Sequence, residues 1–257
     1  MIQIPGYQVK DELGVGGFGR VYRARRASDH KCAIKVQSEV TTTLGTILFR
    51  NEIKALRQLS HPNVVEFLDV IKCNDEVHLV MEFCDGGDLR TLMEDHLERG
   101  LYIHELDVKS IFVQLLLALH HCHQILLTTT GSVKLADFGL CKILHPGKTK
   151  AHSLVGTPGY VAPEVSAGAP YDAKADLFSL GCVLYEMCAL DLPTLDNKAP
   201  CSTDSFIPKS FSSEMEQTVT RLLSQQTSVN HSPVGGPDNC QLAAGDLLFD
   251  RVGLHPI

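Results

Sequence analysis

A lysine interrupts an apolar segment near the start of the chain, in Cys32-Ala33-Ile34-Lys35-Val36. The segment has the composition of a β-strand, where a charge is either an edge-strand solubiliser or a ligand for an anion such as phosphate. Glu52 carries the opposite charge in the helical segment that follows, as an exposed residue or as the partner of Lys35. Upstream, the segment 14–19 reads Gly-Val-Gly-Gly-Phe-Gly, and its N–H groups can face phosphate oxygens or simply form a flexible hairpin. Each of these features has an ordinary structural interpretation and a phosphate-binding one, and no single feature decides between them.

The elements around these residues decide between the alternatives. The glycine-rich segment joins a strand over 7–13 to a strand over 21–24, whereas a dinucleotide-binding fingerprint leads into a helix. The third strand, which carries Lys35, is followed by a helix over 48–59 with apolar residues at helical spacing. Two further strands, 67–71 and 77–81, complete a predicted set of five. We place a domain boundary between residues 83 and 84, within the Gly/Asp-rich link 82–89.

Helices dominate the predicted second domain, residues 84–226. The strongest helical pattern covers 107–123, with apolar residues at Val108, Ile111, Phe112, Leu115, Leu116 and Leu119. Two short strands, 125–127 and 133–136, lead to Asp137-Phe138-Gly139. A buried helix over 175–185 and a helix that starts near Ser212 follow, the latter packing through Val219, Leu222 and Leu223. The pattern fades over a divergent tail, 227–257.

Composition excludes some classes of function. Hydrophobic residues make up 44% of the 257 residues, which is enough for a real core. The net charge of −7 argues against nucleic acid or an anionic membrane as a main partner, since both select a basic face. No run approaches about 18 apolar residues, so no membrane span is predicted. The nine cysteines, without an apparent signal peptide, favour reduced thiols in the cytosol.

These motifs together resemble the eukaryotic protein kinases. Gly14-x-Gly16-x-x-Gly19-x-Val21, Lys35, Glu52, Asp137-Phe138-Gly139 and Ala162-Pro163-Glu164 stand in that family's order and spacing. Gly156-Thr157-Pro158-Gly159-Tyr160 is similar to the serine/threonine type, and the segments 84–89 and 137–141 resemble the NimA-related kinases. The resemblance implies an α+β, bilobal fold: a five-stranded antiparallel N-lobe with one helix, residues 1–83, and a mainly helical, incomplete C-lobe, residues 84–226.

The resemblance also implies ATP and Mg²⁺ as cofactors, bound between the lobes. Lys35, held by Glu52, would contact phosphates, and Asp137 would hold the metal. Met81 matches the gatekeeper, while Val21, Ala33 and Leu126 match residues that enclose the adenine. Glu82 and Cys84 match hinge positions that offer backbone groups. The implied ATP-binding residues are Leu13, Gly14, Gly16, Gly19, Val21, Ala33, Lys35, Glu52, Met81, Glu82, Cys84 and Leu126.

The family's catalytic loop, His-Arg-Asp-x-x-x-x-Asn, is absent from this sequence. The flanks are in register on both sides of His123 and Gln124, and Gln124 falls where the metal-binding asparagine is expected. No aspartate therefore takes the catalytic-base position. The arginine that would bind a phosphorylated activation segment is also absent, although Thr149, Ser153 and Thr157 remain candidate phosphorylation sites.

Asp176 and Glu164 match residues whose family partners are also missing here. A buried carboxylate without its hydrogen-bond donors lowers the stability of the fold.

Three interpretations remain open at this stage. The first is a pseudokinase that binds Mg·ATP and transfers phosphate poorly or not at all. The second is an active serine/threonine kinase that uses a surrogate base, and the third is a spliced or misassembled product of an active kinase gene. Protein substrates and partners are not readable from the sequence. The reduced thiols and the lack of an apparent signal peptide predict a cytoplasmic location, and the resemblance adds cytoskeletal or nuclear association as alternatives.

Overall fold

The computed structural model describes residues 4–16, 19–26, 29–37, 43–73, 76–119, 125–127, 133–135, 159–168, 173–193 and 207–224. The chain divides into two compact units, the first comprising Met1–Thr91 and Leu117–Ile143, the second Leu92–Leu116 and Leu144–Ile257. The predicted boundary after residue 83 and the predicted tail 227–257 stay predictions.

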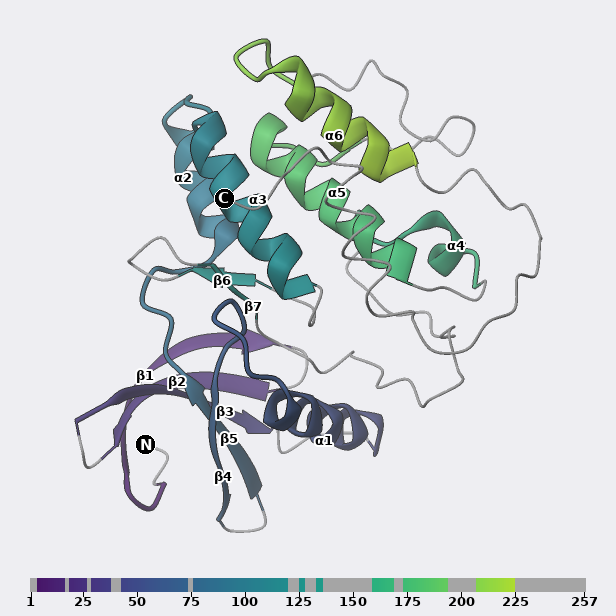
Figure 1. Cartoon of the computed structure of the whole chain (residues 1–257). Helices are drawn as coiled ribbons and strands as arrows, with labels where there is room; N and C mark the ends of the chain where they lie inside the picture. Colours follow the sequence, from purple (N-terminus) through teal and green to yellow (C-terminus); the bar gives the residue numbers. More distant parts are fainter. Residues whose placement is uncertain are drawn as a thin grey trace. The chain divides into compact units, whose positions relative to one another are not determined.

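The first unit is built on a five-stranded antiparallel sheet with the strand order β1-β2-β3-β5-β4 (Figure 1). The strands are β1 (Tyr7–Gly16), β2 (Gly19–Arg26), β3 (Lys31–Gln37), β4 (Phe67–Cys73) and β5 (Glu76–Glu82). β1, β2 and β3 pair in chain order through short connections. β5 then takes the place beside β3, which leaves β4 at the edge. The five-stranded antiparallel sheet expected from the sequence is confirmed.

The helix α1 (Thr43–Gln58) connects β3 to β4 and begins five residues before the predicted start at residue 48. Its first turn contains threonines and a glycine, which are weak helix formers, so propensity alone does not find it. Gln37 Nε2 donates to Thr46 Oγ1 at 3.1 Å and fixes this turn to the end of β3. Phe49, Ile53 and Leu56 are buried on one face of α1, as the helical spacing predicts.

One face of the sheet packs into a hydrophobic cluster whose buried residues come from three strands, β2, β3 and β5, and from the segment before β1. Its buried members are Ile4, Ala24, Cys32, Ile34, Val36 and Val80. His78 of β5 is also buried, and its Nδ1 has no hydrogen-bond partner within the described part of the chain. Burial lowers the pKa of His78, although Glu76, whose Oε2 lies 3.7 Å from Nε2, acts in the opposite direction.

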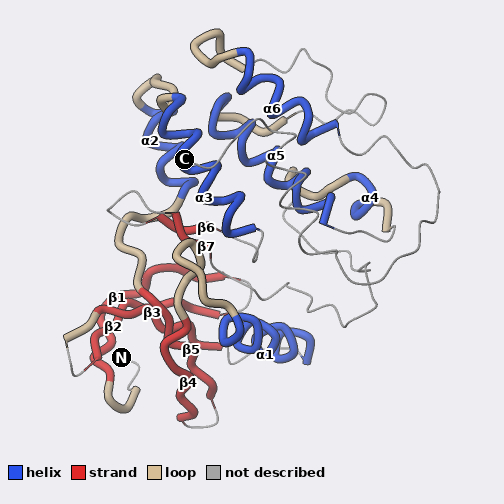
Figure 2. The backbone as a smooth tube through the Cα atoms, in the orientation of Figure 1, coloured by secondary structure: helices blue, strands red, loops and turns tan. Residues whose placement is uncertain are grey.

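Helices make up the described second unit, which Figure 2 draws in blue. They are α2 (Leu89–Glu98, whose first turn belongs to the first unit), α3 (Glu105–Leu119, whose last three residues belong to the first unit), α4 (Pro163–Ser166), α5 (Ala173–Ala189) and α6 (Ser213–Ser224). The sequence analysis did not anticipate α2, although both of its ends carry signals. Asp88 Oδ1 accepts from the N–H of Thr91 at 2.7 Å, which is an N-cap. Gly100 ends the helix with φ +65°, the left-handed conformation that glycine favours.

The remaining helices bury the residues that the apolar pattern predicted. Val108, Ile111, Phe112, Leu115 and Leu116 of α3 are buried, as are Val219, Leu222 and Leu223 of α6. α3 ends at Leu119, four residues before its predicted end, and 120–123 lie outside the described residues. α5 is longer than its predicted core of 175–185 because apolar residues continue through Met187 and Cys188, both fully buried.

α5 and α6 cross closely at a glycine. A Cβ added to Gly181 of α5 would lie 2.8 Å from Leu222 Cβ and 3.2 Å from Leu223 Cδ2, closer than van der Waals contact allows. α5 also holds the segment before α4. Ser179 Oγ donates to the carbonyl of Tyr160 at 2.7 Å, and the Tyr160 hydroxyl donates to Glu186 Oε2. The second unit is therefore fixed by polar contacts as well as by apolar packing.

A two-stranded antiparallel ladder, β6 (Ile125–Leu127) with β7 (Val133–Leu135), belongs to the first unit. It matches the predicted strands 125–127 and 133–136 to within one residue. Within the described parts of the chain, no helix is long and apolar enough to cross a membrane.

Candidate functional site

Lys35 and Glu52 form a buried ion pair in the first unit. Lys35 Nζ lies 2.8 Å from both Oε1 and Oε2 of Glu52, and the two side chains are only 8% and 1% exposed. β3 carries the lysine and α1 carries the glutamate, so the contact joins the sheet to its helix. Lys35 is therefore not an edge-strand charge, and Glu52 is not an exposed helix charge. The role of Lys35 as a phosphate ligand stays a prediction.

The strand register places Lys35 on a definite face of the sheet. Val21 of β2 lies opposite Lys35, and Ala33 of β3 lies opposite Met81 of β5. Directly opposed residues share a face, as do residues two apart on one strand, so these four side chains lie on the same face. The buried residues Ala33, Val65 and Met81 form an apolar cluster there, with Val21, Phe83 and Cys84 partly buried against it.

The structure therefore brings together Val21, Ala33, Met81 and Cys84 beside an anchored ammonium group. Val65 and Phe83 complete the apolar cluster, and the sequence analysis missed both. Their signal was weak, because Val65 belongs to a pair of valines and Phe83 is a single apolar residue, both in connecting segments. The N–H of Glu82 donates to the carbonyl of Glu66 at 3.0 Å, so this particular hinge group is already engaged.

The glycine-rich segment forms the end of the β1–β2 hairpin, with Gly16 paired to Gly19. Gly14 lies opposite Val21, and a Cβ added to it would meet no atom within 4 Å. Gly19 differs, because its Cβ would lie 2.1 Å from the carbonyl oxygen of Val36. The third glycine is thus required by the packing of β2 on β3, whatever the loop binds.

Other predicted site residues are only partly described or not described. Leu13 is 48% exposed on β1, and Leu126 pairs with Lys134 in the β6–β7 ladder, where its backbone alone is described. His123, Gln124, the metal ligand Asp137 and the candidate phosphorylation sites Thr149, Ser153 and Thr157 lie outside the described residues. Within the residues that are described, no group of three or more His, Cys, Asp or Glu side chains gathers to hold a metal ion.

Two acidic residues of the second unit were expected to lack their partners. Glu164 Oε2 is buried and makes no hydrogen bond within the described residues, in accord with the missing arginine. Asp176, in the first turn of α5, is half-buried and does have an interaction partner, so the expected orphaned carboxylate is found at Glu164 and not at Asp176.

Comparisons with known proteins agree with this geometry. Residues 7–232 match the family described as the protein kinase domain. The chain is 34% identical over 245 residues to human serine/threonine-protein kinase Nek2, covering 84% of this chain and 55% of that protein. It is 32% identical over 249 residues to mouse Nek2, covering 86% and 56%, and 37% identical over 202 residues to human Nek5, covering 73% and 28%.

The chain belongs to the protein kinase domain family. Within that family it is similar to the NimA-related serine/threonine kinases, as the segments 84–89 and 137–141 indicated. It spans about half the length of the Nek2 relatives and less of Nek5.

Proposed function

We propose that this chain is a serine/threonine kinase-like domain that binds Mg·ATP and has lost most or all phosphoryl transfer, that is, a pseudokinase. The observation that carries the proposal is the buried Lys35–Glu52 pair, which lies on the same sheet face as the apolar cluster around Ala33. Removing two charges from water is costly, and such a pair contributes little net stability. Its presence is better explained by a binding task.

The described residues fit the two ends of a nucleotide. Lys35 Nζ would donate to phosphate oxygens, and Glu52 would keep that ammonium group in place. The apolar residues Val21, Ala33 and Met81 would contact the flat base, with Leu13, Gly14, Gly16 and Leu126 contributing as the resemblance implies. Cys84 would offer backbone groups to the base edge, and Glu82 would offer its carbonyl, because its N–H already donates to Glu66. Asp137 would hold the Mg²⁺, which supplies positive charge between the phosphate oxygens.

The missing catalytic loop limits the chemistry. A positioned general base typically contributes roughly 10²–10⁴ in rate, and no aspartate takes that position. Gln124 at the place of the metal-binding asparagine would set its oxygen differently, while Mg²⁺ demands near-ideal octahedral geometry. Binding and phosphoryl transfer are therefore expected to be separable in this chain.

The alternative is an active protein kinase that transfers the γ-phosphoryl group of ATP to serine or threonine, or a sequence variant of one. The printed names of the relatives favour it, since all of those reported above are serine/threonine-protein kinases. The register on both sides of His123 and Gln124 favours the loss of a segment from such an enzyme. The sequence of the transcript across these two codons tests that origin directly. In either case we place the domain in the cytosol, where ATP is present and thiols stay reduced.

Nucleotide binding is tested by titrating the purified chain with Mg·ATP and following its thermal unfolding. We expect stabilisation that grows with ATP concentration, because ligand binding to the folded state shifts unfolding. Lys35→Met should abolish the shift. Lys54→Met is the matched control, since Lys54 is an exposed lysine on α1. If Lys35→Met fails to fold, the double variant Lys35→Met/Glu52→Leu replaces it in the experiment, because it leaves no buried charge without a partner. A chain that unfolds identically with and without Mg·ATP would rule out the proposal.

Phosphoryl transfer is tested separately with radiolabelled ATP and a generic protein substrate. We expect turnover far below the usual kinase range of about 1–100 s⁻¹. Turnover near 1 s⁻¹ that disappears in Lys35→Met would establish the active-kinase alternative. Mass spectrometry of the same reaction would show whether Thr149, Ser153 or Thr157 becomes phosphorylated. Phosphorylation at any of them would also support the active-kinase alternative.

A further inference from the structure

A small hollow on the sheet of the first unit is lined by basic side chains. Its volume is about 100 Å³, and its lining residues are Lys10 of β1, Arg23 and Arg25 of β2, and Lys31 of β3. The chain as a whole carries a net charge of −7. Four cations from three neighbouring strands repel one another, so their concentration at one place calls for a physical reason.

The register explains why these four side chains converge. Arg23 and Arg25 are two residues apart on β2, and Arg25 lies directly opposite Lys31 on β3. Val9 pairs with Ala24, which faces the hydrophobic cluster, so Lys10 projects to the other face. Arg23 lies opposite a bulge in β1, which falls between Val9 and Glu12. The hollow is thus part of the regular sheet and is not the product of one loop conformation.

The positive charge of the hollow is only partly neutralised. Arg25 Nη1 lies 2.7 Å from Asp29 Oδ1, and Arg23 pairs with Asp11 Oδ2. Both acidic side chains are more than half exposed, and exposed ion pairs contribute little. No ion pair of Lys10 or Lys31 occurs among the described residues. An incoming anion would therefore meet two ammonium groups that form no ion pair among the described residues. It would also meet two guanidinium groups, each of which has N–H donors beyond those that contact its acidic partner.

The chemistry of this set points to a phosphoryl group. Guanidinium groups bind phosphate through paired N–H donors, and lysines add point charges that need no fixed geometry. The hollow is too small and too isolated for a stretch of nucleic acid, which needs an extended basic surface. We propose that Lys10, Arg23, Arg25 and Lys31 form a binding site for a phosphorylated serine or threonine of a protein partner. This site goes beyond the proposed nucleotide site and does not depend on it.

The site lies away from the proposed phosphate ligand of the nucleotide, although it borders the proposed base-contacting cluster, because Arg23 lies directly opposite Ala33. Lys31 and Lys35 are four residues apart on β3, about 13 Å along the strand, so they lie toward opposite ends of the face that they share. The two sites can therefore be separated by mutation. Lys35→Met/Glu52→Leu should abolish the thermal shift with Mg·ATP and leave phosphopeptide binding intact.

The test uses the full chain and a fluorescein-labelled Gly/Ser peptide with one phosphoserine, followed by fluorescence anisotropy at low salt. The same peptide without phosphate should bind at least about tenfold more weakly, since it lacks the charge-assisted hydrogen bonds. Arg25→Ala and Lys31→Ala should each weaken binding of the phosphopeptide about tenfold. Asp29→Asn should strengthen it, because the competing carboxylate is removed. Inorganic phosphate should displace the peptide.

Arg20→Ala is the matched control for nonspecific attraction. Arg20 lies on the same strand and carries the same charge, but it projects from the opposite face, where it pairs with Glu12 at 3.3 Å. If Arg20→Ala weakens binding as much as Arg25→Ala does, the attraction is general and the proposal is wrong. The proposal also fails if the peptide binds equally with and without its phosphate. Binding of single-stranded DNA or of anionic vesicles tighter than the phosphopeptide, lost in Arg25→Ala, would assign the hollow to another partner and overturn it.

Discussion

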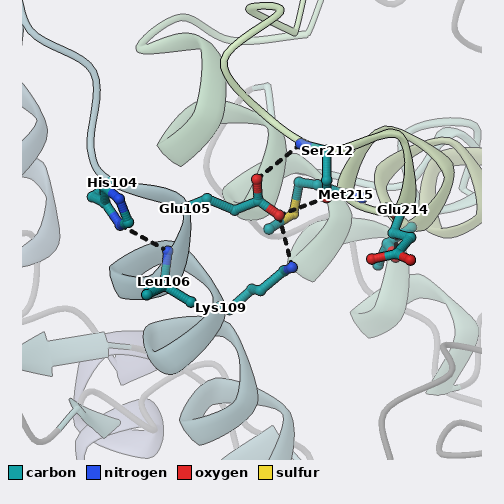
Figure 3. A network of polar contacts seen from close by, with 8 residues as sticks. His104, Glu105, Leu106, Lys109, Ser212, Glu214 and Met215 are labelled. Carbon is teal, nitrogen blue, oxygen red and sulfur yellow. Dashed lines mark hydrogen bonds and ion pairs between the residues drawn. The ribbon is translucent and has the colours of Figure 1, made fainter.

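Glu105, the first residue of α3, accepts two hydrogen bonds from Ser212, which stands 107 residues later at the start of α6. The Ser212 N–H donates to Oε2 at 2.8 Å and its hydroxyl donates to Oε1 at 2.5 Å, while Lys109 Nζ lies 2.7 Å from Oε1 (Figure 3). Ser212 Oγ also accepts from the N–H of Met215 at 3.3 Å and so caps α6. One carboxylate thus fixes the starts of two helices that are far apart in sequence.

We expect Ser212→Ala to lower the free energy of unfolding by about 1–2 kcal/mol, because it removes both a helix cap and a hydrogen bond to a charged group. Urea denaturation followed by circular dichroism measures the loss. Ser213→Ala, at the exposed neighbouring position, is the control and should change stability by less than about 0.5 kcal/mol. Equal effects at the two positions would argue that the Glu105 contact contributes nothing.

The same contact predicts a pH dependence. The bonds from Lys109 and Ser212 lower the pKa of Glu105 from its ordinary value of 4.5 to about 2. A depressed carboxylate pKa contributes stability that is complete above about 4.5 and is lost as the pH falls toward 2. The stability difference between the natural chain and Glu105→Gln should therefore shrink between pH 6 and pH 3. A difference that stays constant over this range would contradict the shift.

The sequence predicted the parts of the fold that local patterns encode. Apolar spacing identified the buried faces of α3 and α6, and the strand composition identified the five strands. The unanticipated helix α2 is short, but its apolar residues Leu89, Leu92, Met93 and Leu97 stand at helical spacing, and Asp88 and Gly100 mark its ends. Attention to caps would have found it.

The candidate site was predictable only through the family pattern. Nothing local to Lys35 or Glu52 distinguishes a buried ion pair from two ordinary surface charges, since the pairing is set by the packing of α1 on the sheet. The basic hollow and the Glu105–Ser212 contact were invisible for the same reason. Both depend on strand register or on helix packing, which bring together residues that the sequence keeps apart.

Gly181 tests whether close helix packing outweighs helix propensity. Replacing a mid-helix glycine by alanine normally stabilises a protein by about 0.5–1 kcal/mol. Here the new methyl group would lie 2.8 Å from Leu222 Cβ, and overpacking costs about 1–3 kcal/mol. We therefore expect Gly181→Ala to destabilise the chain and Gly181→Ser to destabilise it further, in urea titrations. Stabilisation by Gly181→Ala would mean that α5 and α6 separate at no cost.

His78 makes the first unit sensitive to mild acid. Burial lowers the pKa of its ring in the folded state below the ordinary value of 6.5. The unfolded chain therefore takes up a proton near pH 6.5 and the folded chain only at a lower pH, so stability falls as the pH drops below about 6.5. His78→Leu should flatten the dependence of the melting temperature on pH between 7 and 5. His30→Leu, at an exposed histidine, is the control. If the melting temperature of His78→Leu depends on pH as steeply as before, a group other than His78 causes the dependence.

The Lys35–Glu52 pair predicts strongly non-additive mutations. Glu52→Leu leaves a buried ammonium group without its carboxylate and should cost about 3–5 kcal/mol. Lys35→Met leaves the carboxylate without its ammonium group and should cost a similar amount. The double variant removes both charges, so its loss should be much smaller than the sum, as a double-mutant cycle in urea would show. Additive losses would indicate that the two charges do not depend on each other.

Glu164 is expected to behave unlike a residue in a buried ion pair. Its Oε2 is buried without a hydrogen-bond partner among the described residues, so the native state already carries the cost of that burial. Glu164→Met should therefore change the free energy of unfolding by less than about 1 kcal/mol, whereas breaking a buried ion pair costs about 3–5 kcal/mol. Glu186→Met is the matched control, because Glu186 accepts the hydroxyl of Tyr160 and should lose about 1–2 kcal/mol. A loss of about 3 kcal/mol or more in Glu164→Met would instead reveal a cationic partner supplied by the rest of the chain.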